Sequence, residues 1–217
     1  MSALRRIAVL ISGRGSNLQA LLDAESAGQL AGTVVLVISN RADAPGLAIA
    51  QAHGVAIQVI DHGGRDRAAF DAELVAAIER SECDLVVLAG FMRILTEAFV
   101  QRYAGRLINI HPSLLPTFAG LHTHRRALAE GVRIHGCTVH FVTADLDHGP
   151  IIAQAAVPVL AEDDEARLAQ RVLAAEHHIL PAAVRAWCED RLVIADGRVR
   201  VLGETAANGA LVVPVFQ

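Results

Sequence analysis

One stretch of the sequence decides the fold: Ile7-Ala8-Val9-Leu10-Ile11-Ser12-Gly13-Arg14-Gly15-Ser16-Asn17-Leu18. Its first five residues are all apolar, and their number and flanks are typical of a buried parallel strand. Leu18, Leu21 and Leu22 then recur at helical spacing, which places a helix start near Ser16 or Asn17. A strand, a glycine turn and a helix in this order predict the first unit of an α/β fold.

The same alternation continues along the chain. Apolar runs at 33–38, 55–60 and 83–89 predict further buried strands, and residues 65–80 predict an amphipathic helix between the last two. The sequence therefore predicts a Rossmann-like three-layer sandwich with a mostly parallel, twisted sheet.

The C-terminal part is more mixed and predicts antiparallel strands. Residues 135–143 alternate polar and apolar side chains, which is typical of a half-buried strand. Residues 151–159 predict a strand at the sheet edge, because Pro158 cannot donate to a ladder. A long helix over 166–186 and a hairpin over 192–202 complete the pattern, with Asp196-Gly197 at the turn of the hairpin.

Composition limits the possible functions. The 19 basic and 23 acidic residues give a net charge of −4, which argues against a nucleic-acid-binding surface. The three cysteines are far apart and predict neither a disulfide framework nor a zinc site, so we expect a reducing compartment. No apolar run approaches the roughly 18 residues that span a bilayer, and no signal-peptide core is visible. We expect a cytoplasmic protein with no membrane contact.

The glycine turn at 12–17 has three possible readings. It presents backbone N–H groups at a helix N-terminus, which is a ready site for an anion. A dinucleotide site is disfavoured because Leu18 replaces the third glycine and Ser39-Asn40-Arg41 offers no acidic residue for a ribose. A structural turn and a site for a phosphate monoester remain, and we favour the phosphate site.

A second stretch carries the chemistry: Asn109-Ile110-His111-Pro112-Ser113-Leu114-Leu115-Pro116. The run before it predicts a short buried strand, which the prolines must end. Asn109 and His111 are two residues apart, so both side chains point to one face. An amide donor beside an imidazole suits a developing oxyanion.

This octapeptide resembles the signature of the folate-dependent formyltransferases. The run from Ile11 to Leu18 resembles, more narrowly, the opening of the phosphoribosylglycinamide formyltransferases. The resemblance implies transfer of the formyl group of 10-formyltetrahydrofolate to the amine of glycinamide ribonucleotide (GAR) in de novo purine biosynthesis. It implies that Asn109, His111 and Asp147 are catalytic, with direct attack by the amine and no metal.

The resemblance also assigns the substrate contacts. It implies that GAR is bound by Gly15, Ser16, Asn17 and Glu176. It implies that the folate is bound by Arg67, Met92, Arg93, Ile94, Leu95, Asn109, Thr143, Ala144, Asp145, Leu146 and Asp147. The residues alone leave simpler readings open: a core role for the apolar members of 92–95, and surface charges for Arg67 and Glu176.

Two positions depart from the family pattern. Ala119 stands where the family usually has proline, which we expect to loosen the loop slightly. His148 stands where glycine is common, and it could bring an extra imidazole near the pocket.

The pairs His122/His124 and His177/His178 lack the spacing of metal ligands, so we expect no metal.

We expect one domain over 1–217, comprising a phosphate-binding half (1–105), a catalytic and folate-binding half (106–190) and a hairpin with a tail (191–217). The expected partners are GAR and folate, with the protein a monomer or homodimer. A formyl hydrolase, a nicotinamide oxidoreductase and a catalytically silent folate-binding module are the alternative functions.

Overall fold

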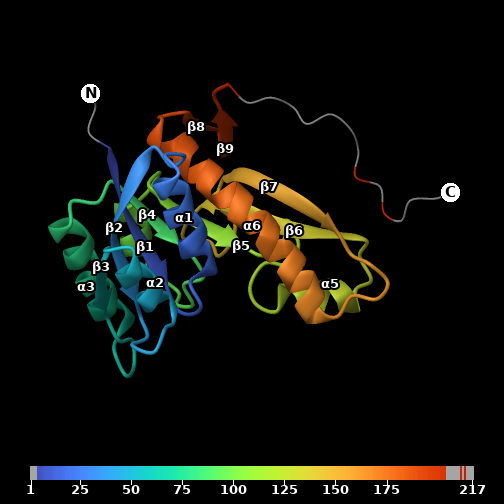
Figure 1. Cartoon of the computed structure of the whole chain (residues 1–217), viewed down its shortest axis with the longest axis horizontal. Coiled ribbons are helices and arrows are strands. Elements are labelled where there is room, and N and C mark those ends of the chain that lie inside the picture. Colours follow the sequence, from blue (N-terminus) through green and yellow to red (C-terminus); the bar gives the residue numbers. More distant parts are fainter. Residues whose placement is uncertain (1–3, 204–210, 212, 214–217) are drawn as a thin grey trace.

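The computed structural model describes residues 4–203, 211 and 213, and these form a sheet flanked by helices (Figure 1). The main sheet has seven strands in the order β3-β2-β1-β4-β5-β6-β7. Strands β1 to β5 run parallel to one another, whereas β6 pairs antiparallel with both β5 and β7. The predicted mostly parallel sheet with an antiparallel C-terminal portion is confirmed.

The elements follow one another in the order that the sequence predicts. The strands are β1 Arg5–Ile11, β2 Gly32–Ser39, β3 Ala56–Val59, β4 Leu85–Leu88, β5 Leu107–His111, β6 Ile134–Phe141, β7 Ile151–Pro158, β8 Leu192–Ala195 and β9 Arg198–Val201. The helices are α1 Ser16–Ser26, α2 Gly46–Ala52, α3 Arg67–Arg80, α4 Glu97–Arg102, α5 Thr123–Ala129 and α6 Glu165–Cys188.

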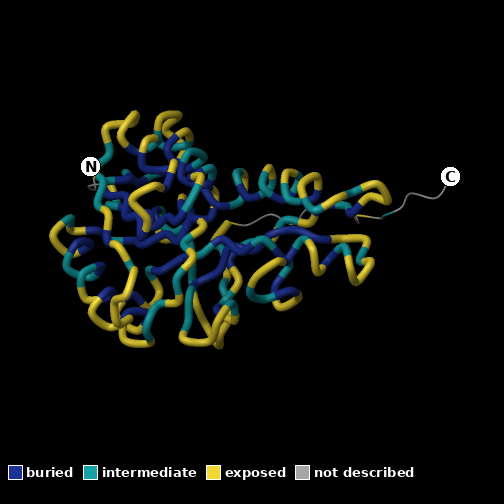
Figure 2. The backbone as a smooth tube through the Cα atoms, turned by 90° about the horizontal axis from the view of Figure 1, so that it is seen from below, coloured by how far each residue is buried: buried dark blue, intermediate teal, exposed yellow. Residues whose placement is uncertain are grey.

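Two apolar clusters, one on each face of the sheet, form the core. Along β1, Ile7 and Val9 belong to one cluster and Ala8 and Leu10 to the other, as the two-residue period of a strand requires. Helices α1, α2 and α6 cover the first face, and α3 and α4 cover the second. The buried strands accordingly run through the middle of the molecule, with the exposed turns outside them (Figure 2). This arrangement is the three-layer sandwich that was predicted.

The sheet changes its direction of winding at β1. The chain passes from β1 to β2 and β3 on one side, and then returns to place β4 on the other side of β1. Loops that leave the carboxyl ends of such strands diverge and open a crevice, where ligands usually bind in open α/β sheets. Met92 in the loop after β4 donates its backbone N–H to Ser12 Oγ in the loop after β1, at 2.7 Å.

Strand β6 differs from its prediction, because it is almost entirely buried and not half-buried. Two of its polar residues, Thr138 and His140, are buried with hydrogen bonds to neighbouring loops and strands. Thr138 Oγ1 donates to the carbonyl oxygen of Ser113 at 2.6 Å and accepts from the N–H of Leu115 at 3.0 Å. The octapeptide loop therefore covers the face of β6 that the alternation assigned to solvent.

The remaining expectations have mixed outcomes. Strand β7 lies at the sheet edge and β8 and β9 form the expected hairpin. In the loop before α2, the carboxylate of Asp43 pairs with Arg41 at 2.8 Å, and no side chain caps the start of this helix. Among the described residues, no helix is long and apolar enough to cross a membrane. The part of the tail after residue 203 lies outside the described residues, apart from 211 and 213.

The tight pairing of β6 with β7 gives a stability prediction. A Cβ at Gly136 would lie 1.9 Å from the carbonyl oxygen of Ala155, so β7 would have to move. We expect Gly136→Ala to lower the free energy of unfolding by about 3 kcal/mol, measured by urea denaturation. Gly63→Ala is the control, because a Cβ there meets its nearest atom, an Asp61 carboxylate oxygen, at 3.4 Å. Equal stability of the two variants would contradict the prediction.

Candidate active site

The site lies at the carboxyl ends of β4 and β5, where Asn109 and His111 face a cavity of about 580 Å³. The two residues are both on β5 and two positions apart, as the sequence predicts. The cavity is lined from β4, β5, β6 and the loops that follow them. Its lining residues are Leu88, Gly90, Phe91, Met92, Arg93, Ile94, Leu95, Val100, Asn109, Ile110, His111, Pro112, Gly120, Leu121, His122, Thr123, His124, His140, Val142, Thr143, Ala144, Leu146 and Asp147.

The amide of Asn109 is oriented by His140, which faces it across the antiparallel pair β5–β6. Nδ1 of His140 lies 2.9 Å from the carbonyl oxygen of Phe141, and a carbonyl can only accept, so Nδ1 carries the proton. Nε2 is then the acceptor for Nδ2 of Asn109, at 3.2 Å. Burial lowers the pKa of His140, which favours this neutral form. The second N–H of the Asn109 amide is left to donate to a ligand.

His111 has an acceptor at each ring nitrogen. Nε2 donates to the carbonyl oxygen of Phe118 at 3.2 Å, and Nδ1 lies 3.5 Å from Oδ2 of Asp147. The imidazole side chain is 8% exposed and the carboxylate 9% exposed, so water screens this pair little. Only the imidazolium can donate from both nitrogens at once. The surroundings of His111 are therefore suited to a ring that donates a proton and stabilises negative charge.

Asp147 joins two loops of the site. Oδ2 of Asp147 accepts the N–H of Gly120 at 2.8 Å, which ties the loop after β6 to the loop after the octapeptide. Asp147 has φ 54°, a left-handed conformation that is uncommon outside glycine, asparagine and aspartate. The backbone thus turns sharply to aim the carboxylate at His111.

Exposed apolar side chains form one wall of the cavity. Met92 is 70% exposed, Ile94 60% and Leu146 58%, so these residues are not part of the core. Apolar surface of this extent beside a polar centre is typical of a site for a flat organic ligand. The core interpretation of Met92 and Ile94 is excluded.

Arg93 and Asp71 hold this wall in place. The guanidinium carbon of Arg93 lies 4.4 Å from the ring centre of Phe70, which ties the wall to α3. Asp71 is buried and accepts the backbone N–H of Thr96 at 2.6 Å, two residues after Ile94 of the wall. The amphipathic pattern of α3 predicted Phe70 inside but gave no sign that a charged neighbour would be buried with it.

Three residues with expected or suspected roles lie away from the cavity lining. Arg67 is exposed at the first turn of α3, and Asp145 is exposed in the loop before Asp147. His148 is exposed, with Nδ1 2.9 Å from the carbonyl oxygen of Leu146. The departure from glycine at position 148 therefore adds no imidazole to the cavity lining.

Three of the four expected GAR residues, Gly15, Ser16 and Asn17, lie at the start of α1, and the fourth, Glu176, is on α6. Gly15 precedes the helix with φ 78°, and a Cβ there would lie 2.6 Å from Cα of Gly46, so this turn requires glycine. Asn17 Nδ2 donates to Oε2 of Glu176 at 2.7 Å, from α1 to α6. Glu176 is 6% exposed, and burial raises the pKa of its carboxyl, an effect that the hydrogen bond from Asn17 opposes. The surface-charge interpretation of Glu176 is wrong.

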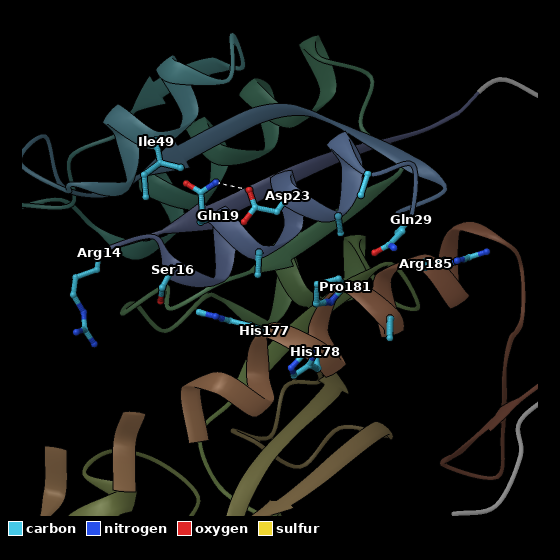
Figure 3. Close-up of a pocket in the computed structure, with 14 residues that line it drawn as sticks. Arg14, Ser16, Gln19, Asp23, Gln29, Ile49, His177, His178, Pro181 and Arg185 are labelled. Atoms are coloured by element: carbon cyan, nitrogen blue, oxygen red, sulfur yellow. Dashed lines mark hydrogen bonds between the residues drawn. The ribbon is translucent and has the colours of Figure 1, made fainter. Parts of the chain in front are cut away.

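A second cavity of about 810 Å³ lies between α1 and α6, beside this group (Figure 3). Arg14, Ser16 and His177 lie together at one end of it, and a hydrogen bond of 2.7 Å joins Gln19 to Asp23 along its wall. Since Ser16 also belongs to the glycine turn, this cavity opens next to that turn.

A further pair of histidines, His124 and His135, lies near His111. The rings of His124 and His135 meet edge to face with centres 5.5 Å apart, and His135 meets Phe118 similarly at 5.6 Å. Burial lowers the pKa of His124, and that of His135 to about 4. Within the described ranges, no group of three or more histidine, cysteine or acidic side chains is arranged to hold a metal ion.

Comparisons with known proteins agree with this geometry. A family model described as formyl transferase matches residues 5–184. The phosphoribosylglycinamide formyltransferase of Escherichia coli is 53% identical over 187 residues, which are 86% of this chain and 88% of that protein. The crystal structure of glycinamide ribonucleotide transformylase 1 from Symbiobacterium toebii has a TM-score of 0.90 at 51% identity, covering 92% of this chain and 94% of that one.

The chain therefore belongs to the formyl transferase family. The narrower resemblance, to the phosphoribosylglycinamide formyltransferases, is confirmed by these relatives. A formyltetrahydrofolate deformylase from Pseudomonas syringae pv. tomato shares the fold with a TM-score of 0.87 at 30% identity, and the match covers 92% of this chain and 66% of that one.

Sequence reasoning missed several contributors to the site. His140 was assigned to the solvent face of its strand, and only the pairing of β6 with β5 shows that it faces Asn109. Phe118 and Gly120 act through backbone groups, which no side-chain pattern reveals.

The buried histidine pair predicts a loss of stability in acid. His135 titrates near 6.5 when unfolded and at about 4 when folded, so its neutral form stabilises the fold above about pH 6.5 and that stability falls toward pH 4. We expect His135→Phe to lose less stability than the wild-type protein between about pH 7.5 and pH 5, measured by urea denaturation. His178→Phe is the matched control, since His178 is exposed. The same acid sensitivity in wild type and His135→Phe would refute the prediction.

Proposed function

We propose that this enzyme transfers the formyl group of 10-formyltetrahydrofolate to the amine of GAR, giving formyl-GAR and tetrahydrofolate in de novo purine biosynthesis. The relatives named above support the choice of GAR as acceptor. The hydrogen bond between Asn17 and Glu176 is the observation that carries this choice. It joins a phosphate-type turn to a buried carboxyl group, two features that a ribonucleotide with an amine at its other end would need.

The glycine turn would bind the phosphate of GAR. Backbone N–H groups at the start of α1 point outward with the positive end of the helix dipole, and Ser16 adds a hydroxyl. Glu176 would accept a hydrogen bond from the glycinamide part. This arrangement favours transfer to an amine over transfer to water.

The folate would occupy the apolar cavity. A volume of about 580 Å³ falls within the usual range of ligand pockets, and the wall formed by Met92, Ile94 and Leu146 suits a flat ring. Arg67 and Asp145 lie outside the lining, and we propose that they contact the more exposed end of the folate. No metal is required in this proposal.

The chemistry would proceed by direct attack. The neutral amine of GAR forms a bond to the formyl carbon, and the carbonyl oxygen becomes an oxyanion. The free N–H of Asn109 and the ring of His111 would stabilise this oxyanion in a site that excludes most water. The carbon–nitrogen bond to the folate then breaks, and a proton passes from the attacking nitrogen to the leaving nitrogen. Asp147 would hold His111 in its proton-donating form and orientation.

One assay tests the function as a whole. We expect consumption of a 10-formyltetrahydrofolate analogue, followed by absorbance, to require GAR. Consumption without GAR would indicate a deformylase and refute the proposed acceptor. Tight folate binding with no turnover would indicate a silent binding module, and binding of NADH at micromolar level would favour an oxidoreductase.

The role of Asn109 gives a quantitative expectation. Loss of one donor to an oxyanion lowers the rate by roughly 10²–10³-fold, and we expect Asn109→Ala to lower kcat by that factor. The KM for GAR should change little, because the proposed phosphate turn follows β1 whereas Asn109 is on β5. The midpoint of urea unfolding serves as the control for folding. Near-normal kcat in Asn109→Ala would exclude this assignment.

A further inference from the structure

Arg126 holds the turn that follows the octapeptide. From α5, its Nη1 donates to the carbonyl oxygen of Ala119 at 2.6 Å. Its guanidinium carbon lies 5.5 Å from the ring centre of Phe118. A charge-assisted hydrogen bond is stronger than one between neutral groups, and the attraction of the cation to the ring face adds to it. One side chain therefore fixes two successive residues of the turn.

Phe118 needs such support. Its φ is 56°, which is a strained conformation for a bulky residue and persists only where the surroundings hold it. The residue is 9% exposed, and its ring is enclosed by His135 on one side and the guanidinium of Arg126 on another. Ala119 stands where a proline ring would stiffen the backbone, so the stiffness here has to come from side chains.

The turn acts directly on the catalytic centre. The carbonyl oxygen of Phe118 accepts from Nε2 of His111 at 3.2 Å. Two residues later, the N–H of Gly120 donates at 2.8 Å to the Asp147 carboxylate oxygen that faces Nδ1 of His111. A shift of the turn would therefore disturb the partners of both ring nitrogens.

We propose that Arg126 is a positioning residue for formyl transfer, which acts by clamping the 118–120 turn so that His111 keeps its orientation. The inference rests on the proposed function and deepens it. It assigns a role in catalysis to Arg126, although this side chain does not line the cavity.

The adjacent Arg125 supplies a matched control. It lies on the same helix, and its Nε pairs with Oε2 of Glu165 on α6 at 3.1 Å. Arg126→Gln and Arg125→Gln therefore remove the same charge from neighbouring positions, and only the first loosens the turn. The experiment measures kcat, both KM values and the ¹⁵N signal of His111 Nε2, assigned with His111→Gln.

For Arg126→Gln we expect kcat to fall about tenfold, because small misplacements of a catalytic group are costly, with the KM for GAR nearly unchanged. The Nε2 signal should move as its hydrogen bond weakens, and Arg126→Lys should recover part of both properties because it keeps a charged donor. Arg125→Gln should match the wild-type protein in both.

Equal kcat and an equal Nε2 signal in the two glutamine variants would overturn the proposal. Should Arg126→Gln fail to fold, Arg126→Lys and Phe118→Leu provide the same test with smaller changes. An absence of GAR-dependent turnover in the wild-type protein would refute the proposed function. The ¹⁵N signal of His111 Nε2 is read without substrate, so it would still decide whether Arg126 positions the 118–120 turn.

Discussion

The antiparallel register between β5 and β6 is the constraint on which the site depends. It sets Asn109 opposite His140 and His111 opposite Thr138. The first pairing orients the amide, and the second anchors the octapeptide loop through the Thr138 hydroxyl. A slip of β6 by one residue would turn His140 and Thr138 to the other face of the sheet, away from Asn109 and His111. The reversal of β6 in an otherwise parallel sheet therefore brings the polar groups of the candidate site together.

Burial gives the histidines of the site different tasks. Withdrawal from water lowers the pKa values of His124, His135 and His140, which favours their neutral forms. His111 is also buried, and each of its ring nitrogens faces an acceptor. Neutral rings can pack closely and accept hydrogen bonds, as His140 does from Asn109. The surroundings, and not the residue type, make this distinction.

Much of the fold and part of the site could be predicted from the sequence. The strand and helix periods gave the three layers, and the spacing of Asn109 and His111 gave their common face. Side-chain alternation failed for His140 and Thr138, because a strand covered by a loop buries polar groups that have partners. Glu176 looked like an ordinary helix charge, since Asn17 is 159 residues away in the sequence. Phe118 acts through its backbone carbonyl, which sequence patterns do not encode.

The two edges of the sheet are short or covered, and this has a consequence for the behaviour of the protein in concentrated solution. Strand β3 has four residues, and β7 ends in Pro158 with β9 packed beside it. Unpaired strand edges are templates on which other chains add and polymerise. A short edge offers few hydrogen bonds to an incoming strand, and the hairpin obstructs access to the longer one. The C-terminal hairpin, whose residues line neither of the two cavities described above, therefore covers part of the edge at which another chain could add.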